Sequence, residues 1–70
     1  NVAVGDQALD ANTTGDYHTA VGRNALSSVT TTSGHTAIGY NAANTLHTGQ
    51  DNVVVGALSN TSSPSSSNEI

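Results

Sequence analysis

The small and hydrophobic residues of this chain recur in one short pattern that is written four times. Each copy begins with Asn or His, continues with small and β-branched residues, and ends in a glycine, as in HTAVGRNAL at residues 18–26. The glycines are Gly5, Gly22, Gly39 and Gly56, spaced 17 residues apart each time. A fixed period with similar residue types at each position predicts a solenoid, in which each coil buries its apolar face against its neighbours.

The period divides the chain into coils at 1–17, 18–34, 35–51 and 52–68. The regular array covers 1–58, and the serine-rich stretch 59–68 predicts a looser last half-coil or linker. Residues 69–70 begin a next coil. Because both ends fall in phase and neither resembles a capping segment, we expect the chain to be an excerpt of a longer fibre.

Each coil carries its own sequence of predicted elements. Positions one to five alternate in side-chain size and include β-branched residues, which predicts a strand of about five residues. The apolar spacing i, i+1, i+4 in Ala25-Leu26-x-x-Val29 suits a single helical turn. Polar segments such as Asn12-Thr13-Thr14-Gly15 then predict a closing turn. The expected fold class is all-β, a parallel β-solenoid (β-roll or β-helix) with one short helical turn per coil.

Several columns of the repeat are candidates for the core or for contacts between chains. They are position four (Val4, Val21, Ile38, Val55), position three (Ala3, Ala20, Ala37, Val54), position eight (Ala8, Ala25, Ala42) and position nine (Leu9, Leu26). Positions two and four share one bulky strand face, and position three shares a nearly bare face with the glycine. The favoured hypothesis puts valine and isoleucine in the coil interior and the Ala/Gly face against another chain. The opposite assignment, with valine and isoleucine on a three-fold axis, stays open.

Composition argues against a compact monomeric globule. The 70 residues include no Phe, Trp, Met or Cys, and only 34% are hydrophobic, so no bulky core or disulfide can stabilise a single small domain. The net charge is −4 and Arg23 is the only Lys or Arg, which excludes binding to nucleic acid and to anionic membranes. No apolar stretch approaches the roughly 20 residues that span a bilayer, and the start lacks the basic residues of a signal peptide. We expect any export signal to lie outside this chain.

The motif [N/H]-x-A-[V/I]-G-x-x-A-L, with T-T-G between copies, carries a resemblance over about residues 1–56 and more loosely 57–70. It resembles the head repeats of trimeric autotransporter adhesins, and more closely the repeat arrays of bacteriophage tail fibres that often precede a self-cleaving chaperone domain. The resemblance implies a parallel β-roll or β-helix, three identical chains side by side, and an extracellular role in attachment. Adhesin heads have coils shorter than 17 residues, which favours the phage-type array. The last coil departs from the motif, because Ala57-Leu58 directly follows Gly56.

Position one forms a column of polar residues: Asn1, His18, His35 and Asn52. In a trimer, His18 and His35 would ring an axis and offer imidazole ligands to a transition metal. No H-x-H pair accompanies them, and a strand-start His or Asn more often forms a hydrogen-bonded side-chain ladder. The acidic residues fall in different columns and the Gly/Asp nonapeptide of calcium-binding β-rolls is absent. We predict a structural ladder, with no metal and no other cofactor.

Two further columns suggest surface features. Asp6 lies one coil before Arg23 in the same column, which predicts a weak surface ion pair. Thr14, Thr31 and Thr48 form a threonine column, and flat threonine arrays on solenoids can bind ice. That function needs T-x-T on one strand face, whereas Thr13-Thr14 is an adjacent pair whose side chains would point to opposite sides.

Catalysis needs a nucleophile near a base, or two carboxylates at a set separation, and the sequence brings no such groups together. The serines in Ser62-Ser63-Pro64-Ser65-Ser66-Ser67 have the composition of a linker. We therefore predict a non-enzymatic, structural and adhesive fibre segment, the shaft repeat region of a phage tail fibre that supports host attachment. Its partners would be two further copies of itself and, through neighbouring regions, a host-surface receptor or extracellular matrix, with a virion or extracellular location. The alternatives are the head of a bacterial cell-surface trimeric adhesin or an extracellular filament, and an ice-binding solenoid.

Overall fold

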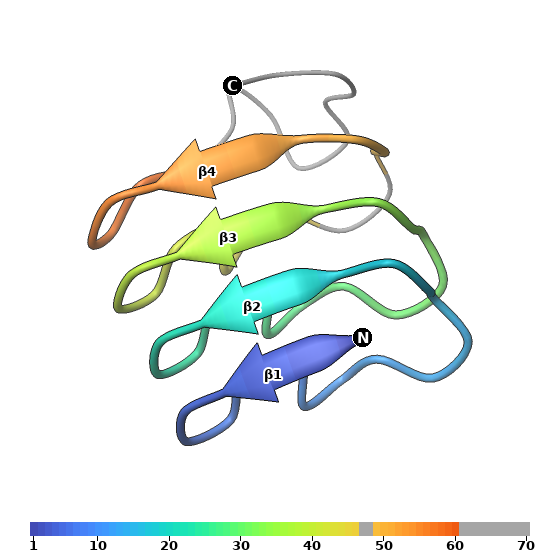
Figure 1. Cartoon of the computed structure of the whole chain (residues 1–70), viewed down its shortest axis with the longest axis horizontal. Helices are drawn as coiled ribbons and strands as arrows, with labels where there is room; N and C mark the ends of the chain where they lie inside the picture. The colour runs from blue at the N-terminus through green and yellow to red at the C-terminus, as the bar shows by residue number, and fades with distance from the viewer. Residues whose placement is uncertain (47–48, 61–70) are drawn as a thin grey trace.

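The computed structural model describes residues 1–46 and 49–60. It contains four strands of three residues each, β1 (Val2–Val4), β2 (Thr19–Val21), β3 (Thr36–Ile38) and β4 (Val53–Val55). They form one parallel sheet in the order β1-β2-β3-β4, stacked with all strands pointing the same way (Figure 1). The prediction of an all-β chain with one parallel strand per repeat is confirmed.

Each strand residue pairs with the residue 17 positions away along the chain, which is the period of the sequence. Ala20 pairs with Ala3 on one side and with Ala37 on the other, so each residue lies beside its equivalent in the next repeat. The connecting segments are joined in the same way. The Asn24 N–H donates to the Asp6 carbonyl at 3.0 Å, and the Leu26 N–H donates to the Ala42 carbonyl at 3.0 Å. Repeats therefore pair along their strands and also along their return segments.

The segment after each glycine is a chain of tight turns, so the predicted helical turn is wrong. The Ala25 N–H donates to the Gly22 carbonyl at 3.2 Å, and the Ser27 N–H donates to the Asn24 carbonyl at 3.2 Å. Asn24 and Leu26 have φ angles of 60° and 54°, which a right-handed α-helix does not contain. No helix forms in residues 1–46 and 49–60, and none there is available to cross a membrane.

The glycine column is required by both backbone angle and space. Gly22 has a φ of 126°, and a Cβ on it would lie 2.5 Å from the Gly39 carbonyl oxygen. Gly39 has a φ of 130°, and its Cβ would lie 2.7 Å from the Gly56 carbonyl carbon. Residues with side chains rarely adopt such angles. Each strand ends directly before its glycine, and it has three residues rather than the five expected. The steric conflict arises with the next repeat of the same chain.

The core is a thin layer between the sheet and the return segments. Its buried hydrophobic residues are Leu9, Ala20, Ala25, Leu26, Val29, Ala37, Ala42, Ala43, Leu46 and Val54, with Ala8 packed against them. The sheet contributes small position-three side chains, and the return segments contribute most of the leucines. With an extent of only 15 Å along its shortest axis, the molecule has room for one layer of side chains between its two walls.

Position-four side chains point away from this core, which corrects the favoured hypothesis of the sequence analysis. Val4 is 57% exposed, Ile38 42% and Val55 66%, whereas Ala20 and Ala37 in position three are fully buried. Leucines of the return segments fill much of the interior, so the position-three side chains beneath them are small in β2 and β3 (Ala20 and Ala37). Valine and isoleucine therefore face outward in the single chain, and the three-fold axis of the opposite assignment stays a prediction.

We expect Gly22→Val or Gly39→Val to destabilise the folded protein by about 3 kcal/mol or more, because each new side chain meets backbone atoms of the next repeat in a strained φ region. Asp10→Ala removes an exposed carboxylate and should change stability by less than about 0.5 kcal/mol. Thermal melts followed by circular dichroism compare the variants. Equal melting temperatures for all three would contradict the role assigned to the glycine column.

Candidate functional site

The outward side of the sheet is an uncharged surface, which we call the outer face. It consists of the residues at positions two and four: Val2, Val4, Thr19, Val21, Thr36, Ile38, Val53 and Val55. Every member is β-branched, the residue type that packs well on a pleated surface. Val2, Val4 and Val55 are each more than half exposed, at 53%, 57% and 66%. Exposed apolar side chains grouped on one uncharged face make it a candidate interaction site.

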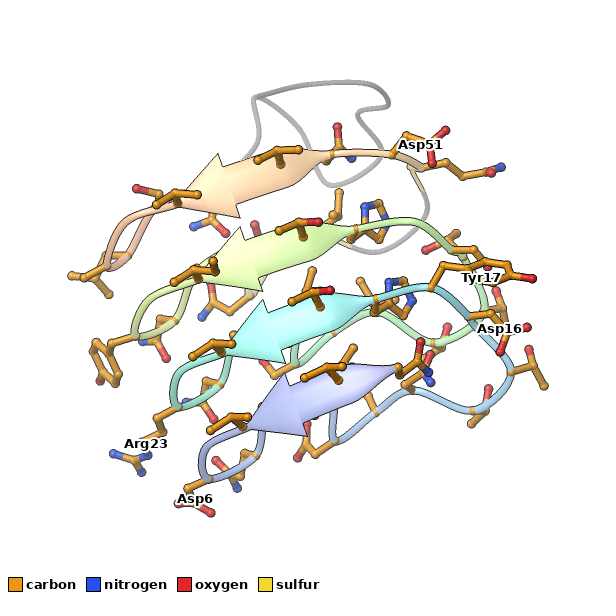
Figure 2. The ribbon with its side chains drawn as sticks, viewed as in Figure 1. Asp6, Asp16, Tyr17, Arg23 and Asp51 are labelled. Atoms are coloured by element: carbon orange, nitrogen blue, oxygen red, sulfur yellow. The ribbon has the colours of Figure 1, made fainter. Side chains whose placement is uncertain are left out.

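Charged side chains border the outer face and leave its centre uncharged. Asp6 and Arg23 lie at the edge where the strands end, and Asp16 and Asp51 lie at the edge where the strands begin (Figure 2). Tyr17 stands beside Asp16 and is 83% exposed. An apolar centre with a polar rim is the usual anatomy of a protein–protein interface.

The second candidate is the column of position-one residues, Asn1, His18, His35 and Asn52, which we call the position-one ladder. His18 is 2% exposed, and His35 and Asn52 are fully buried. The backbone N–H of each residue points at the side chain one repeat earlier. The His18 N–H donates to Asn1 Oδ1 at 2.9 Å, the His35 N–H to His18 Nδ1 at 3.2 Å, and the Asn52 N–H to His35 Nδ1 at 3.4 Å.

The other end of the Asn1 and His18 side chains is bonded to its own repeat. Asn1 Nδ2 donates to the Gly15 carbonyl at 3.0 Å, and His18 Nε2 lies 2.8 Å from the Thr32 carbonyl in the equivalent position. A backbone N–H can only donate, so His18 Nδ1 must be unprotonated and Nε2 must carry the hydrogen. These contacts tie the start of the strand to its return segment and to the next strand.

The two histidine rings stack on one another, with centroids 5.3 Å apart and planes within 4° of parallel. Burial lowers the pKa of both rings from the usual 6.5, and this effect outweighs the opposing influences of nearby backbone carbonyls and carboxylates. Both His18 ring nitrogens have hydrogen-bond partners. In the part of the chain that the structure describes, no three His, Cys, Asp or Glu residues gather as a metal site.

The predicted ion pair is present at the surface. Arg23 Nε lies 3.6 Å from Asp6 Oδ2, and the two side chains are 58% and 75% exposed (Figure 2). Such an exposed pair contributes well under ~1 kcal/mol. The prediction of a weak pair between consecutive repeats is confirmed.

The remaining predicted residues divide between core and surface. Leu9, Leu26, Ala25 and Ala42 lie in the core, whereas Ala3 in the first strand is exposed. Thr14 and Thr31 are exposed on return turns, outside the strands. Thr48 and the serines of 62–67 lie outside the described residues.

Position twelve was not recognised as a core column in the sequence analysis. Val29 and Leu46 are both fully buried at position twelve. Each is a lone bulky apolar residue among polar ones, which is the signal that identifies an inward position. Their i, i+4 spacing from Ala25 and Ala42 had instead favoured a helical turn.

Comparison of the chain with protein-family models, with curated proteins and with solved structures gives no match. The functional argument therefore depends on the outer face and the position-one ladder.

The ladder predicts that His18→Leu costs about 1–3 kcal/mol of stability at pH values above neutrality, since it leaves the buried His35 N–H and Thr32 carbonyl without partners. His18→Asn should retain most of the stability, because Asn1 makes the equivalent pair of bonds in the first repeat. Urea unfolding of the two variants measures the difference. If leucine and asparagine are tolerated equally, the ladder bonds contribute little to stability.

Proposed function

We propose that the chain is a β-solenoid segment of a homotrimeric extracellular fibre, the shaft repeat region of a phage tail fibre that supports host attachment. The observation that carries this proposal is the outer face, where valines, an isoleucine and threonines stand uncharged on the outward side of a parallel sheet. In one isolated chain this surface meets water. Burying these apolar side chains against another chain would remove them from water and add a favourable free energy to a chain with few hydrophobic residues.

The partner best suited to the outer face is a second copy of this chain. The face presents the same pair of columns in every repeat, so copies aligned side by side meet with matched spacing along the whole sheet. A cyclic three-fold arrangement brings all three faces to one axis and leaves none exposed. The charged residues Asp6, Arg23, Asp16 and Asp51 at the rim would remain solvated (Figure 2).

The thin core supplies the energetic argument for assembly. Ordering a residue costs roughly 1–2 kcal/mol, and a repeat of 17 residues buries only a few leucine, valine and alanine side chains. Burial at about 25 cal/mol per Å² must therefore draw on neighbouring repeats and on neighbouring chains. Rigidity of the fibre, which holds a receptor-binding tip away from a particle or cell, would come from these contacts between chains.

A cell-surface trimeric adhesin or an extracellular filament would use the same architecture and is the alternative setting for this function. Ice binding is a second candidate function, favoured by one observation. Thr19 and Thr36 are paired neighbours on the outer face, which favours it. The strands read T-x-V and T-x-I rather than the T-x-T of ice-binding arrays, which argues against it. Thermal hysteresis in solution tests this candidate, and a trimer that buries the outer face would remove the surface from contact with ice.

The trimer predicts that glutamates on the outer face prevent assembly. The double variant Val21→Glu, Ile38→Glu would bring carboxylates from three chains to one axis, where their charges repel and lose solvation. The matched control is Thr31→Glu, which adds a carboxylate at an exposed return turn. Sedimentation should show three times the 7.0 kDa chain mass for the wild type and the control, and a smaller species for the double variant. Full assembly of the double variant would contradict the proposed interface.

The same argument predicts that folding depends on assembly. At low micromolar concentration the chain should show little β structure by circular dichroism, and it should gain β structure at higher concentration or when fused to a trimerising domain. A folded monomer of 7.0 kDa under these conditions would contradict the trimer and indicate a single-chain solenoid.

A further inference from the structure

We infer that the position-one ladder is an acid-sensitive clasp, in which protonation of His18 or His35 breaks the contacts that hold β2, β3 and β4 on one another. The inference uses contacts within one chain. It therefore stands or falls separately from the proposed fibre function.

The ladder hydrogen bonds require neutral rings, because one nitrogen of each ring must accept a hydrogen bond. His18 Nδ1 accepts the His35 backbone N–H at 3.2 Å, while His18 Nε2 donates to the Thr32 carbonyl at 2.8 Å. An imidazolium carries hydrogens on both nitrogens, so a protonated His18 would direct one donor at another donor. Flipping the ring does not restore the hydrogen bond, because neither nitrogen of the cation can accept the His35 N–H. The His35 backbone N–H, directly before β3, would lose its partner inside the protein.

His35 repeats this arrangement one strand later. Its Nδ1 accepts the Asn52 N–H at 3.4 Å, and its Nε2 lies 3.2 Å from the Thr32 hydroxyl. The Gly49 carbonyl also hydrogen-bonds this ring. Since the two rings stack with centroids 5.3 Å apart, a positive charge on one disfavours a charge on the other.

The charged groups around the rings do not offset burial. Asp16 favours the charged form of His18 and Asp51 that of His35, whereas the N-terminal ammonium opposes the charge on His18. Burial is the largest influence on both residues and lowers their pKa values from 6.5. In the unfolded chain both rings return to their ordinary pKa.

Below about pH 6.5 the unfolded chain consequently binds more protons than the folded chain, and acidification favours unfolding. As the pH rises past 6.5 the rings become neutral in both states and the dependence fades. Between the unfolded and the folded pKa, each fall of one pH unit raises the unfolding equilibrium constant by up to about 10-fold for each histidine. The two histidines together raise it by up to about 100-fold per pH unit.

The first repeat shows how to remove the titration while keeping the bonds. Asn1 Oδ1 accepts the His18 N–H and Asn1 Nδ2 donates to the Gly15 carbonyl, so asparagine performs both tasks without an ionisable group. The matched variant is therefore the double substitution His18→Asn, His35→Asn. It leaves His47 and every carboxylate unchanged.

The test measures urea unfolding of the full chain between about pH 7.5 and about pH 5, at a concentration where circular dichroism shows it folded. We expect the wild-type unfolding constant to be flat above pH 6.5 and to rise steeply below it, with most of that rise absent from the double variant. An identical pH dependence in the two proteins would overturn the inference.

A second measurement needs no variant. Nitrogen and proton NMR of the wild-type rings should show His18 and His35 protonated only at Nε2, with titration midpoints below 6.5 in the folded protein. A hydrogen on Nδ1 at neutral pH, or midpoints at or above 6.5, would overturn the inference even if the asparagine variant did not fold.

Discussion

The hydrogen bonding of each repeat to its equivalent in the next repeat is the interaction on which the rest of the structure depends. Bonds such as Asn24 to Asp6 and Leu26 to Ala42 extend it beyond the strands into the return segments. As a result, residues meet others of the same column: glycine backbone lies on glycine backbone, histidine ring on histidine ring, and valine beside valine or isoleucine. A substitution is thus felt by the same column in the repeats on either side.

This stacking distributes polarity in an unusual way. His18 and His35 are polar yet buried, because each ring accepts the backbone N–H of the following repeat. The outer face is apolar yet exposed, because the return segments cover only the opposite side of the sheet. In a single chain the polar column is already satisfied and the apolar surface is not. The surface that remains unburied is the outer face, and for this reason we propose a second copy of the chain, rather than a small ligand, as its partner.

The spacing of four glycines was enough to predict the strand order and register, since a period of 17 residues determines which residues become neighbours. It also predicted the Asp6–Arg23 pair, but it did not indicate that the histidine column is buried. The turns after the glycine were not predictable, because Leu26 with a positive φ is uncommon and its apolar neighbours match a helical spacing. Strand alternation defined two faces without showing which is interior. That choice depends on Leu26 and Leu46 crossing from the return segments, a contact between distant parts of the repeat.

The ladder and the outer face respond to different conditions because their chemistry differs. The outer face contains valine, isoleucine and threonine, none of which titrates near neutral pH, so apolar contact through it would persist in mild acid. The ladder carries its two buried imidazoles between consecutive strands of one chain. Acid would therefore weaken the stacking of β2, β3 and β4 through the ladder, whereas the proposed contact between chains contains no group that titrates in this range.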